Sequence, residues 1–196
     1  MKKNNVIAFF DGLAPDWDSN AVHDDEVINL ILDYSGIRKN ATVLDVACGT
    51  GVLVPYYIAR NAGKIIGVDI SPEMIRIAKS KFYDPPVLFI NGDIEEILFD
   101  ELFDCCVVFN ALPHFPSPNG LIKKLSSLLN NRGRLTIAHG MSRDQINSLH
   151  ASSASQVSSV LMSETELASL MGQFLNVDTA VADGQMFIVS GFNDRV

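Results

Sequence analysis

A glycine-rich turn and a later acidic residue have the spacing of groups that hold a nucleoside. The turn, residues 47–51 (ACGTG), directly follows an apolar run. Asp69 lies eighteen residues after Gly51. In nucleotide-binding β-α-β units, an acidic residue about 20 positions further on hydrogen-bonds the ribose 2′-hydroxyl. Because a carboxylate accepts hydrogen bonds from hydroxyl groups and repels a 2′-phosphate, this spacing predicts that Asp69 binds a ribose.

The same turn lacks the residues that grip a phosphate chain. It does not match the dinucleotide pattern G-x-G-x-x-G, and no lysine follows it as in a P-loop. Gly49 and Gly51 still allow a ligand to approach the backbone closely. After the apolar run 87–92, Asp93 can accept a hydrogen bond from an exocyclic amine such as that of adenine, while Ile94 packs on the ring. These stretches predict an adenosine site without a phosphate clamp.

Four histidines are candidates for acid–base chemistry. His114 follows an apolar run, His139 ends another, His150 lies in a polar stretch, and His23 lies near the N-terminus. Histidine titrates near neutral pH, so each could take a proton or orient a substrate, and each could instead be a hydrogen-bonded structural residue. We predict a catalytic role for His114, His139 and His150. Imidazoles suit zinc or iron, but the spacing from His139 to His150 matches no standard ligand pattern, so we expect no metal.

The candidate residues follow segments that read as strands alternating with helices. Apolar runs predict strands at 42–47, 64–70, 87–92, 103–110 and 133–139. Helical periodicity and capping residues predict helices at 19–35, 52–61, 71–82 and 118–130. Ser19 is the predicted cap of the first helix, and Ser71 caps the third.

The C-terminal part predicts one more helix and a hairpin. Ser163 and Glu166 form a capping-box pattern before an apolar face, and Asp183-Gly184 joins two predicted strands, 175–182 and 185–191. Alternating β-α units closed by an antiparallel hairpin predict a doubly wound α/β sheet with a mixed edge. In such a sheet, ligands bind at the carboxyl ends of the strands, where the candidate residues lie.

Composition narrows the class of protein. The 196 residues carry a formal net charge of −8 and contain no basic cluster, so nucleic acids and anionic membranes are unfavourable partners. No apolar run approaches the roughly 18 residues of a membrane-spanning helix. The three cysteines form no disulfide framework. We expect one cytoplasmic domain over residues 1–196, monomeric or homodimeric, that acts on a small molecule and binds neither nucleic acid nor membrane.

Four stretches together resemble the successive motifs of class I S-adenosylmethionine-dependent methyltransferases. They are VLDVACGTG, GVDISPEM, NGDIEE and FDCCVVFNALPHF, and the resemblance spans roughly residues 40–140. It is nearest to the branch of ubiquinone and menaquinone biosynthesis methyltransferases. The resemblance implies a Rossmann-like fold with a seven-stranded sheet in the order 3-2-1-4-5-7-6. It also implies S-adenosyl-L-methionine as cofactor and S-adenosyl-L-homocysteine as product.

The resemblance also assigns roles to residues. It places the turn 47–51 under the methionine part, Asp69 at the ribose hydroxyls, Asp93 and Ile94 at adenine, and Asn110 near the methionine amino group. Ala47 stands where a glycine is common, and its small side chain should still let the turn close. The full expected cofactor-binding set is Asp45, Ala47, Cys48, Gly49, Gly51, Asp69, Ile70, Met74, Asp93, Ile94, Asn110 and Trp17.

Two flanking segments are expected on the substrate side. The stretch AFFDGLAPDWDSN resembles the start of the same branch, which implies an N-terminal helical lid over residues 1–36. There Phe10, Asp16 and Trp17 could close the site, or the helix could simply pack its aromatics on the core. Residues 140–162 form the second segment, in which Arg143 could bind an anionic group or be an ordinary surface residue. The expected substrate contacts are Phe10, Trp17, His114 and Arg143.

These features favour a methyltransferase that moves a methyl group to a small acceptor by in-line displacement. The stretch NALP differs from the N-P-P-(Y/F) motif of enzymes that methylate nucleic-acid amines. Two alternatives remain: a non-catalytic S-adenosylmethionine-binding or regulatory protein, and another enzyme on the same scaffold, such as a dehydrogenase. The missing pyrophosphate loop weighs against the dehydrogenase.

Overall fold

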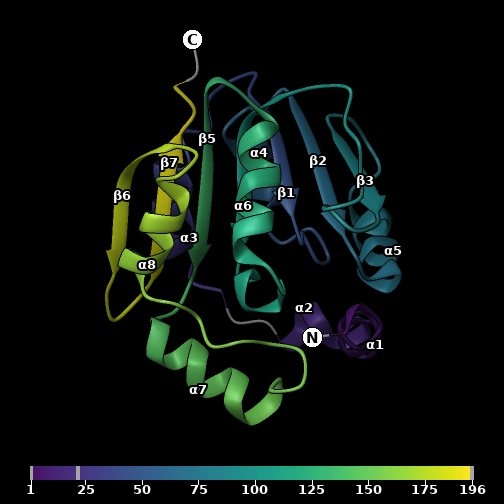
Figure 1. Ribbon diagram of the computed structural model, residues 1–196. Helices are drawn as coiled ribbons and strands as arrows, with labels where there is room; N and C mark the ends of the chain where they lie inside the picture. Colours follow the sequence, from purple (N-terminus) through teal and green to yellow (C-terminus); the bar gives the residue numbers. More distant parts are fainter. Residues whose placement is uncertain (1, 21–22, 195–196) are drawn as a thin grey trace.

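The protein forms a single seven-stranded sheet with helices on both faces (Figure 1). The computed structural model describes residues 2–20 and 23–194. The strand order is β3-β2-β1-β4-β5-β7-β6, as the resemblance implied. All neighbouring strands are parallel except β7, which runs antiparallel to β5 and β6. The strands are β1 (Thr42–Val46), β2 (Lys64–Asp69), β3 (Val87–Asn91), β4 (Phe103–Phe109), β5 (Leu129–His139), β6 (Asn176–Ala182) and β7 (Phe187–Phe192).

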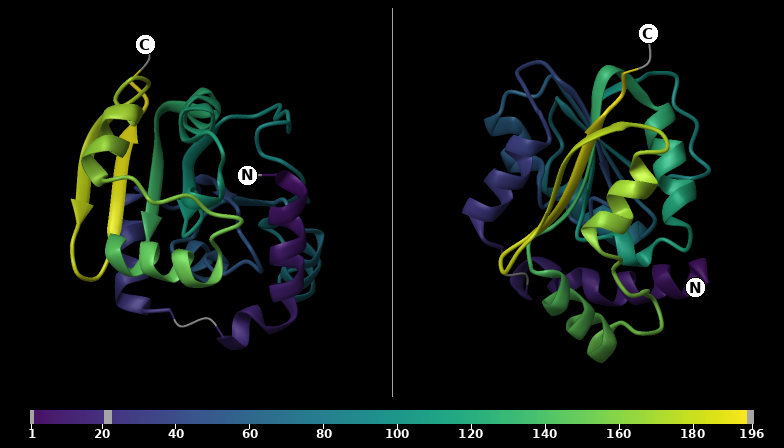
Figure 2. Two further views of the ribbon diagram at one scale, coloured as in Figure 1. Left: turned by 60° about the horizontal axis from the view of Figure 1, so that its bottom comes forward. Right: turned by 60° about the vertical axis from the view of Figure 1, so that its left-hand side comes forward.

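Helices α3, α4 and α5 cover one face of the sheet, and α6 and α8 cover the other (Figure 2). Three helices, α1, α2 and α7, lie instead below the carboxyl ends of the parallel strands in Figure 1. The helices are α1 (Lys3–Leu13), α2 (Trp17–Asn20), α3 (Asp25–Tyr34), α4 (Val54–Ala59), α5 (Pro72–Lys81), α6 (Pro118–Ser127), α7 (Arg143–Ser153) and α8 (Glu164–Met171), with short 3₁₀ turns η1 (Ala14–Asp16) and η2 (Leu112–His114).

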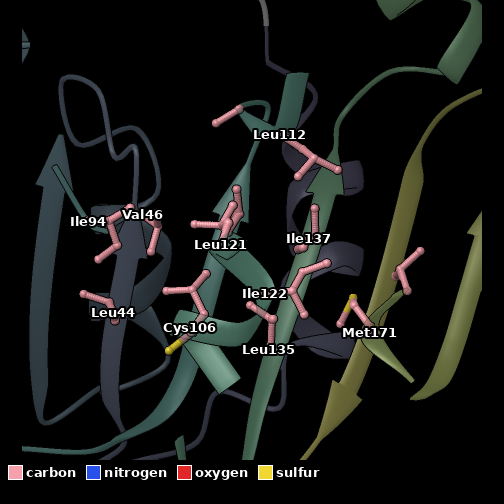
Figure 3. Close-up of a cluster of buried hydrophobic side chains, with 14 of the residues drawn as sticks. Leu44, Val46, Ile94, Cys106, Leu112, Leu121, Ile122, Leu135, Ile137 and Met171 are labelled. Carbon is pink, nitrogen blue, oxygen red and sulfur yellow. The ribbon is translucent and has the colours of Figure 1, made fainter. Parts of the chain in front are cut away.

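Two apolar layers, one on each face, hold the sheet in place. Successive residues of a strand point to opposite faces, so Leu44 and Val46 join the layer under α6 while Val43 joins the layer under α3 and α4. Figure 3 shows the first of these layers. Cys105 and Cys106 are both buried, one in each layer, which fits the role of small apolar side chains. Full burial of a large apolar side chain contributes about 1.5–3 kcal/mol, so these layers fix the strand ends that carry the site.

The predicted helix 19–35 is confirmed over Asp25–Tyr34, but its predicted start at Ser19 is wrong. The structure has two separate helices here, and residues 21–22 of the predicted helix lie outside the described residues. Asp24, not Ser19, caps the second helix: its Oδ1 accepts hydrogen bonds from the backbone N–H groups of Glu26 and Val27. Ser19 lies within α2 and donates to the Asp16 carbonyl oxygen. A residue with extended backbone and a short acceptor side chain can cap a helix when residues with helical periodicity follow it directly. Asp24 has this conformation directly before α3, whereas Ser19 lies farther upstream.

Other boundaries differ by a few residues. Helix α6 ends at Ser127, and β5 already begins at Leu129, because Leu128 and Leu129 are buried beside the sheet rather than on the helix. Helix α4 is shorter than the predicted 52–61, since residues 51–53 are a turn. The Ser71 cap and the Ser163–Glu166 capping box are confirmed. The polar stretch after β5 contains a helix, α7, whose capping box is formed by Ser142 and Gln145.

Candidate functional site

A cavity of about 440 Å³ lies at the carboxyl ends of the parallel strands and is lined on its other side by residues of α1, α2 and α7. Its volume is in the range of about 300–1,000 Å³ that is typical of small-molecule sites. Fifteen predicted site residues line it: Phe10, Trp17, Asp45, Ala47, Cys48, Gly49, Asp69, Ile70, Met74, Asp93, Ile94, Asn110, His114, His139 and His150. The fold therefore brings nearly the whole predicted set to one place.

The turn after β1 is built from residues in the left-handed region. Ala47, Gly49 and Gly51 have φ angles of 55°, 55° and 85°. For a residue with a Cβ, such as Ala47, this conformation costs roughly 1–2 kcal/mol, so surrounding contacts must hold it. Gly51 does not line the cavity. A Cβ there would lie 3.0 Å from the Phe82 ring, so Gly51 shapes the turn from below instead of contacting a ligand.

Asp69 supplies one of those surrounding contacts. At the end of β2, its Oδ2 accepts a hydrogen bond from Gly49 N–H and its Oδ1 accepts one from Ser71 N–H, both at 2.8 Å. Burial raises the pKa of this carboxyl, while the two backbone hydrogen bonds oppose that rise. Each carboxylate oxygen keeps a further lone pair, so Asp69 can hold the turn and still accept from a ligand hydroxyl group.

Asp45 is a buried carboxyl group of the site with an oxygen atom left unpartnered in the described part of the chain. Its side chain is 2% exposed, and its Oδ2 has no hydrogen-bond partner among the described residues. Burial raises the pKa of Asp45 to about 8; the neighbouring Tyr57 hydroxyl group opposes this rise and the charge of Asp69 adds to it. A buried polar atom without a partner costs free energy, and a cationic or hydrogen-bond-donating ligand group would remove that cost. Asp45 therefore fits a ligand that brings an amine to the first turn.

Asp93 is already paired with the N-terminal helix. Its Oδ2 forms an ion pair with Lys3 of α1, which also contacts Glu96, and its Oδ1 accepts from Glu95 N–H. These contacts raise the pKa of Lys3 above its ordinary value. Any ligand amine that binds Asp93 must share it with Lys3, a connection between α1 and the cavity that the sequence did not reveal.

The N-terminal helices are fastened over the cavity by polar contacts at both ends. Ser71 Oγ donates to Asp11 of α1, and Asp18 of α2 accepts from Thr50 Oγ1 and pairs with Lys81 at 2.7 Å. The aromatic rings lie between these anchors. Phe10 meets Trp17 and His114 edge-on, with ring centroids 5.9 and 4.9 Å away. Asp16, expected to help closure, does not line the cavity.

The three predicted catalytic histidines meet at the other end of the cavity. Nδ1 of His114 hydrogen-bonds the Val157 carbonyl oxygen at 2.8 Å, and the His114 and His150 ring centroids are 5.0 Å apart. Burial lowers the pKa of His114 to about 4 and that of His139 to about 3, and it also lowers the pKa of His150. All three imidazoles are therefore neutral at pH 7. Among the described residues, no group of three or more histidine, cysteine, aspartate or glutamate side chains is arranged to hold a metal ion.

Asn110 and Arg143 have different outcomes. Asn110 ends β4 at a φ of 55°, lines the cavity and accepts from Gly140 N–H through Oδ1, so it ties the ends of β4 and β5 together. Arg143 does not line the cavity. Its Nε donates to the Leu161 carbonyl oxygen at 2.9 Å, so it anchors α7 to the following loop. The predicted contact of Arg143 with a substrate anion finds no support in this arrangement.

Sequence reasoning missed one wall of the cavity. Ile146, Leu149 and His150 of α7 all line it, and their spacing of i, i+3 and i+4 puts them on one helix face. That spacing, with the Ser142–Gln145 capping pattern, was a readable signal for α7. The other missed lining residues carry no motif: Lys3, Val6, Val52, Leu53, Val68, Gly92, Glu95, Phe109, Ala111, Phe115, Pro116, Gly140 and Met141.

The sequence matches known methyltransferases. A family model described as a methyltransferase domain matches residues 43–133. A malonyl-[acyl-carrier protein] O-methyltransferase of Anoxybacillus flavithermus is 32% identical over 100 residues, covering 50% of this chain and 39% of the relative. A ubiquinone/menaquinone biosynthesis C-methyltransferase, UbiE, of Hahella chejuensis is 26% identical over 148 residues, covering 69% and 59%. The chain thus spans between about two fifths and three fifths of the length of these relatives.

Solved structures share the fold along nearly the whole chain. One is a chain of the complex between the Trm112 methyltransferase activator of Haloferax volcanii and a methyltransferase, with a TM-score of 0.79 at 18% identity, covering 95% of this chain and 98% of that one. Another is the N-methyltransferase NodS of Bradyrhizobium japonicum in complex with S-adenosyl-L-homocysteine, with a TM-score of 0.75 at 15% identity and 98% coverage of both chains. Motifs, sheet order and sequence matches agree: the chain is similar to the class I S-adenosylmethionine-dependent methyltransferases in its sequence motifs and shares their fold.

Proposed function

We propose that the protein transfers the methyl group of S-adenosylmethionine to a small-molecule acceptor held in the same cavity. The observation that carries this proposal is the division of the cavity into two ends. Three carboxylates, Asp45, Asp69 and Asp93, lie at or just after the ends of β1, β2 and β3 on one side of the sheet order, and three neutral histidines follow β4, end β5 or lie on α7 on the other side. The first end suits a cofactor with ribose, amine and adenine groups, and the second leaves room for an acceptor.

The cofactor is proposed to lie along the strand ends. The ribose hydroxyls bind the free lone pairs of Asp69, and adenine packs against Ile94 with its amine at Asp93. The methionine part lies over the turn 47–51, and its amine is held by Asn110 and by the unpartnered Oδ2 of Asp45. Trp17, which lies beside Gly49, covers this part from the lid. Cys48, Ile70 and Met74 form the apolar floor.

The chain's own contribution is positioning and exclusion of water. When bound, the cofactor supplies a methyl group on a sulfonium, with a neutral thioether as leaving group. Holding an acceptor in line with that methyl group can contribute about 7–11 kcal/mol. Helices α1 and α7 supply the cover: Val6 of α1 packs with Ala154 and Val157, just beyond α7, and Phe9, Phe10 and Ile70 pack against them.

A small acceptor is supported by the cavity volume of about 440 Å³ and by the net charge of the chain. The net charge of −8 opposes nucleic-acid binding, and the UbiE relative is named for ubiquinone/menaquinone biosynthesis. No helix among the described residues is long and apolar enough to cross a membrane. Three further statements stay predictions. They are the cytoplasmic location, the monomeric or homodimeric state, and the single domain over 1–196 with a lid at 1–36 and a substrate-side segment at 140–162.

Calorimetry with S-adenosyl-L-homocysteine and with NAD tests the cofactor assignment. We expect the first to bind and the second not to bind. Asp69→Ala should lower the affinity for S-adenosyl-L-homocysteine at least tenfold, because it removes the ribose acceptor and frees the turn. Asp183→Ala, at the distant hairpin, is the matched control and should leave the affinity unchanged. Binding of NAD without binding of S-adenosyl-L-homocysteine would contradict the proposal, and binding without any methyl transfer would favour a regulatory protein.

A further inference from the structure

Three of the four histidines that line the cavity come from separate segments but share one end of it. His114 lies in η2, His139 ends β5, and His150 lies on α7. The His114 and His150 rings are 5.0 Å apart, and both of these groups contribute to the low pKa of His139. Three imidazoles in a single apolar pocket carry six ring nitrogens, and the hydrogen-bonding state of these nitrogens indicates what the pocket binds.

The tautomer of His114 follows from its partner. A backbone carbonyl oxygen can only accept a hydrogen bond, so the Nδ1 of His114 that contacts Val157 must carry the hydrogen. In the neutral ring, Nε2 is then a bare acceptor. No described residue donates to this Nε2. The Val157 carbonyl thus acts as a positioning group, because it fixes both the orientation of the ring and the side that accepts.

The other two histidines each leave a nitrogen unsatisfied. Nε2 of His139 and Nδ1 of His150 are buried without a hydrogen-bond partner among the described residues, and His139 is only 2% exposed. Buried polar atoms in folded proteins nearly always have partners, so these two nitrogens point to a missing one. A hydroxyl group can both donate to one ring nitrogen and accept from the N–H of another.

The walls of this end are apolar and carry no charge of their own. Phe10 packs edge-on against His114, and Phe115, Ile146 and Leu149 line the cavity nearby. Lys3 is the one lysine or arginine among the described lining residues, and it is paired with Asp93 and Glu96 at the other end. An anionic acceptor would therefore find no counter-charge beside the histidines, whereas a ring with an uncharged polar group would fit both walls and nitrogens.

We propose that this end of the cavity is the acceptor subsite, that it takes an uncharged ring compound bearing a hydroxyl group, and that Nε2 of His114 accepts the hydroxyl proton. This inference rests on the proposed methyltransferase function. The hydroxyl proton passes to His114 Nε2 as the acceptor oxygen forms its bond to the methyl carbon. The electron pair of the broken sulfur–carbon bond stays on sulfur, and the imidazolium then releases the proton to water.

Ligand titrations followed by nuclear magnetic resonance test this subsite with three simple probes. Phenol carries the hydroxyl group, fluorobenzene has the same ring without it, and benzoate has the ring with a negative charge. With S-adenosyl-L-homocysteine bound, we expect phenol to bind about tenfold more tightly than fluorobenzene, as one hydrogen bond allows, and benzoate to bind more weakly than phenol. The ¹⁵N spectrum should show His114 protonated at Nδ1 and should shift at Nε2 when phenol is added.

A matched variant separates recognition from folding. His114→Asn retains an amide N–H near the position of Nδ1, so it can still donate to Val157, but it has no group at the position of Nε2. The preference for phenol over fluorobenzene should disappear in this variant while the thermal midpoint changes little. An unchanged preference, a His114 protonated at Nε2, or tightest binding of benzoate would each overturn the inference. The titrations are repeated without S-adenosyl-L-homocysteine, so failure of that ligand to bind would contradict the proposed function while the probe preferences still test the subsite.

Discussion

The two ends of the cavity differ in how their polar side chains are held in place. At the carboxylate end, two of the three carboxylates have partners: Asp69 accepts from Gly49 and Ser71, and Asp93 accepts from Glu95 and pairs with Lys3. Only Asp45 Oδ2 lacks a partner among the described residues of this end. At the histidine end, residues from distant segments meet, and ring nitrogens are left without partners. The carboxylates lie at or just after strand ends along the sequence, whereas the histidines converge from a turn, a strand end and α7. We infer from this contrast that the cofactor part of such a site can be read from successive strand ends, whereas the acceptor part depends on how distant segments fold together.

The histidine end should dominate the loss of stability in acid. The folded-state pKa values of His114 and His139, about 4 and about 3, lie below the ordinary value, so the unfolded chain binds more protons between pH 6.5 and pH 4. Stability is therefore present at pH 7 and falls as the pH decreases, by about 3 kcal/mol for His114 alone. Urea unfolding across this range gives the free energy of unfolding at each pH. In the double variant His114→Asn/His139→Gln, this free energy should depend much less on pH than in the parent. An unchanged pH dependence would contradict the buried, neutral state of these rings.

Asp45 should give the opposite pH dependence at the carboxylate end. Its folded-state pKa of about 8 lies above the ordinary value, so the unfolded chain ionises first and stability is lost as the pH rises from 4 to 8. Asp45→Asn cannot ionise and should be more stable than the parent at pH 8 without ligand, on the order of 5 kcal/mol. The same variant should bind S-adenosyl-L-homocysteine more weakly. A variant of lower stability at pH 8 would show that the parent carboxylate has a partner in solution.

A substitution at Gly67 tests whether the turn 47–51 can be distorted while the histidine end stays unchanged. A Cβ at this position of β2 would lie 2.7 Å from the Phe89 ring and 2.9 Å from Cys48 Sγ in the turn. Gly67→Ala should therefore cost about 1–3 kcal/mol and weaken S-adenosyl-L-homocysteine binding. Gly184→Ala is the control, because nothing lies within 4 Å of its Cβ position. Equal free energies of unfolding of the two variants in urea would show that the turn can move away from a Cβ at position 67 without loss of stability.

Lys3 should give the smallest effect. It is an exposed group that links α1 to Asp93, and exposed ion pairs contribute little to stability. Lys3→Met should leave the thermal midpoint nearly unchanged but speed dissociation of S-adenosyl-L-homocysteine a few-fold, because α1 loses a contact with Asp93 beside the cavity. Lys2→Met is the matched control. Stopped-flow dissociation rates that agree between the two variants would show that the contacts of Asp11 and Asp18 are enough to hold α1 and α2.

The carboxylate end was predictable because its signals are local. The apolar runs predicted five parallel strands, Ser71 announced its helix, and Asp69 and Asp93 follow directly from strand ends. Where the signals were competing, prediction failed: Asp24 instead of Ser19 caps α3, and Leu129 belongs to β5 although it also extends the periodicity of α6. Propensity alone could not rank these choices, because burial against the sheet decided them.

The histidine end was only partly predictable. His114, His139 and His150 could be proposed from residue type, but their convergence depends on how α7 folds back across the strand ends. No spacing rule links Val157 to His114, since that contact joins residues 43 positions apart. For the same reason, the role of Arg143 as an anchor of α7, and that of Gly51 as a support beneath the turn, emerged only from the three-dimensional arrangement.

A crystal structure with bound S-adenosyl-L-homocysteine tests the central claim most directly. The account predicts the ribose on Asp69, adenine against Ile94, and the sulfur atom facing the end of the cavity that His114, His139 and His150 line. A ligand that lies in the reverse direction, or whose sulfur faces away from all three histidines, would contradict it.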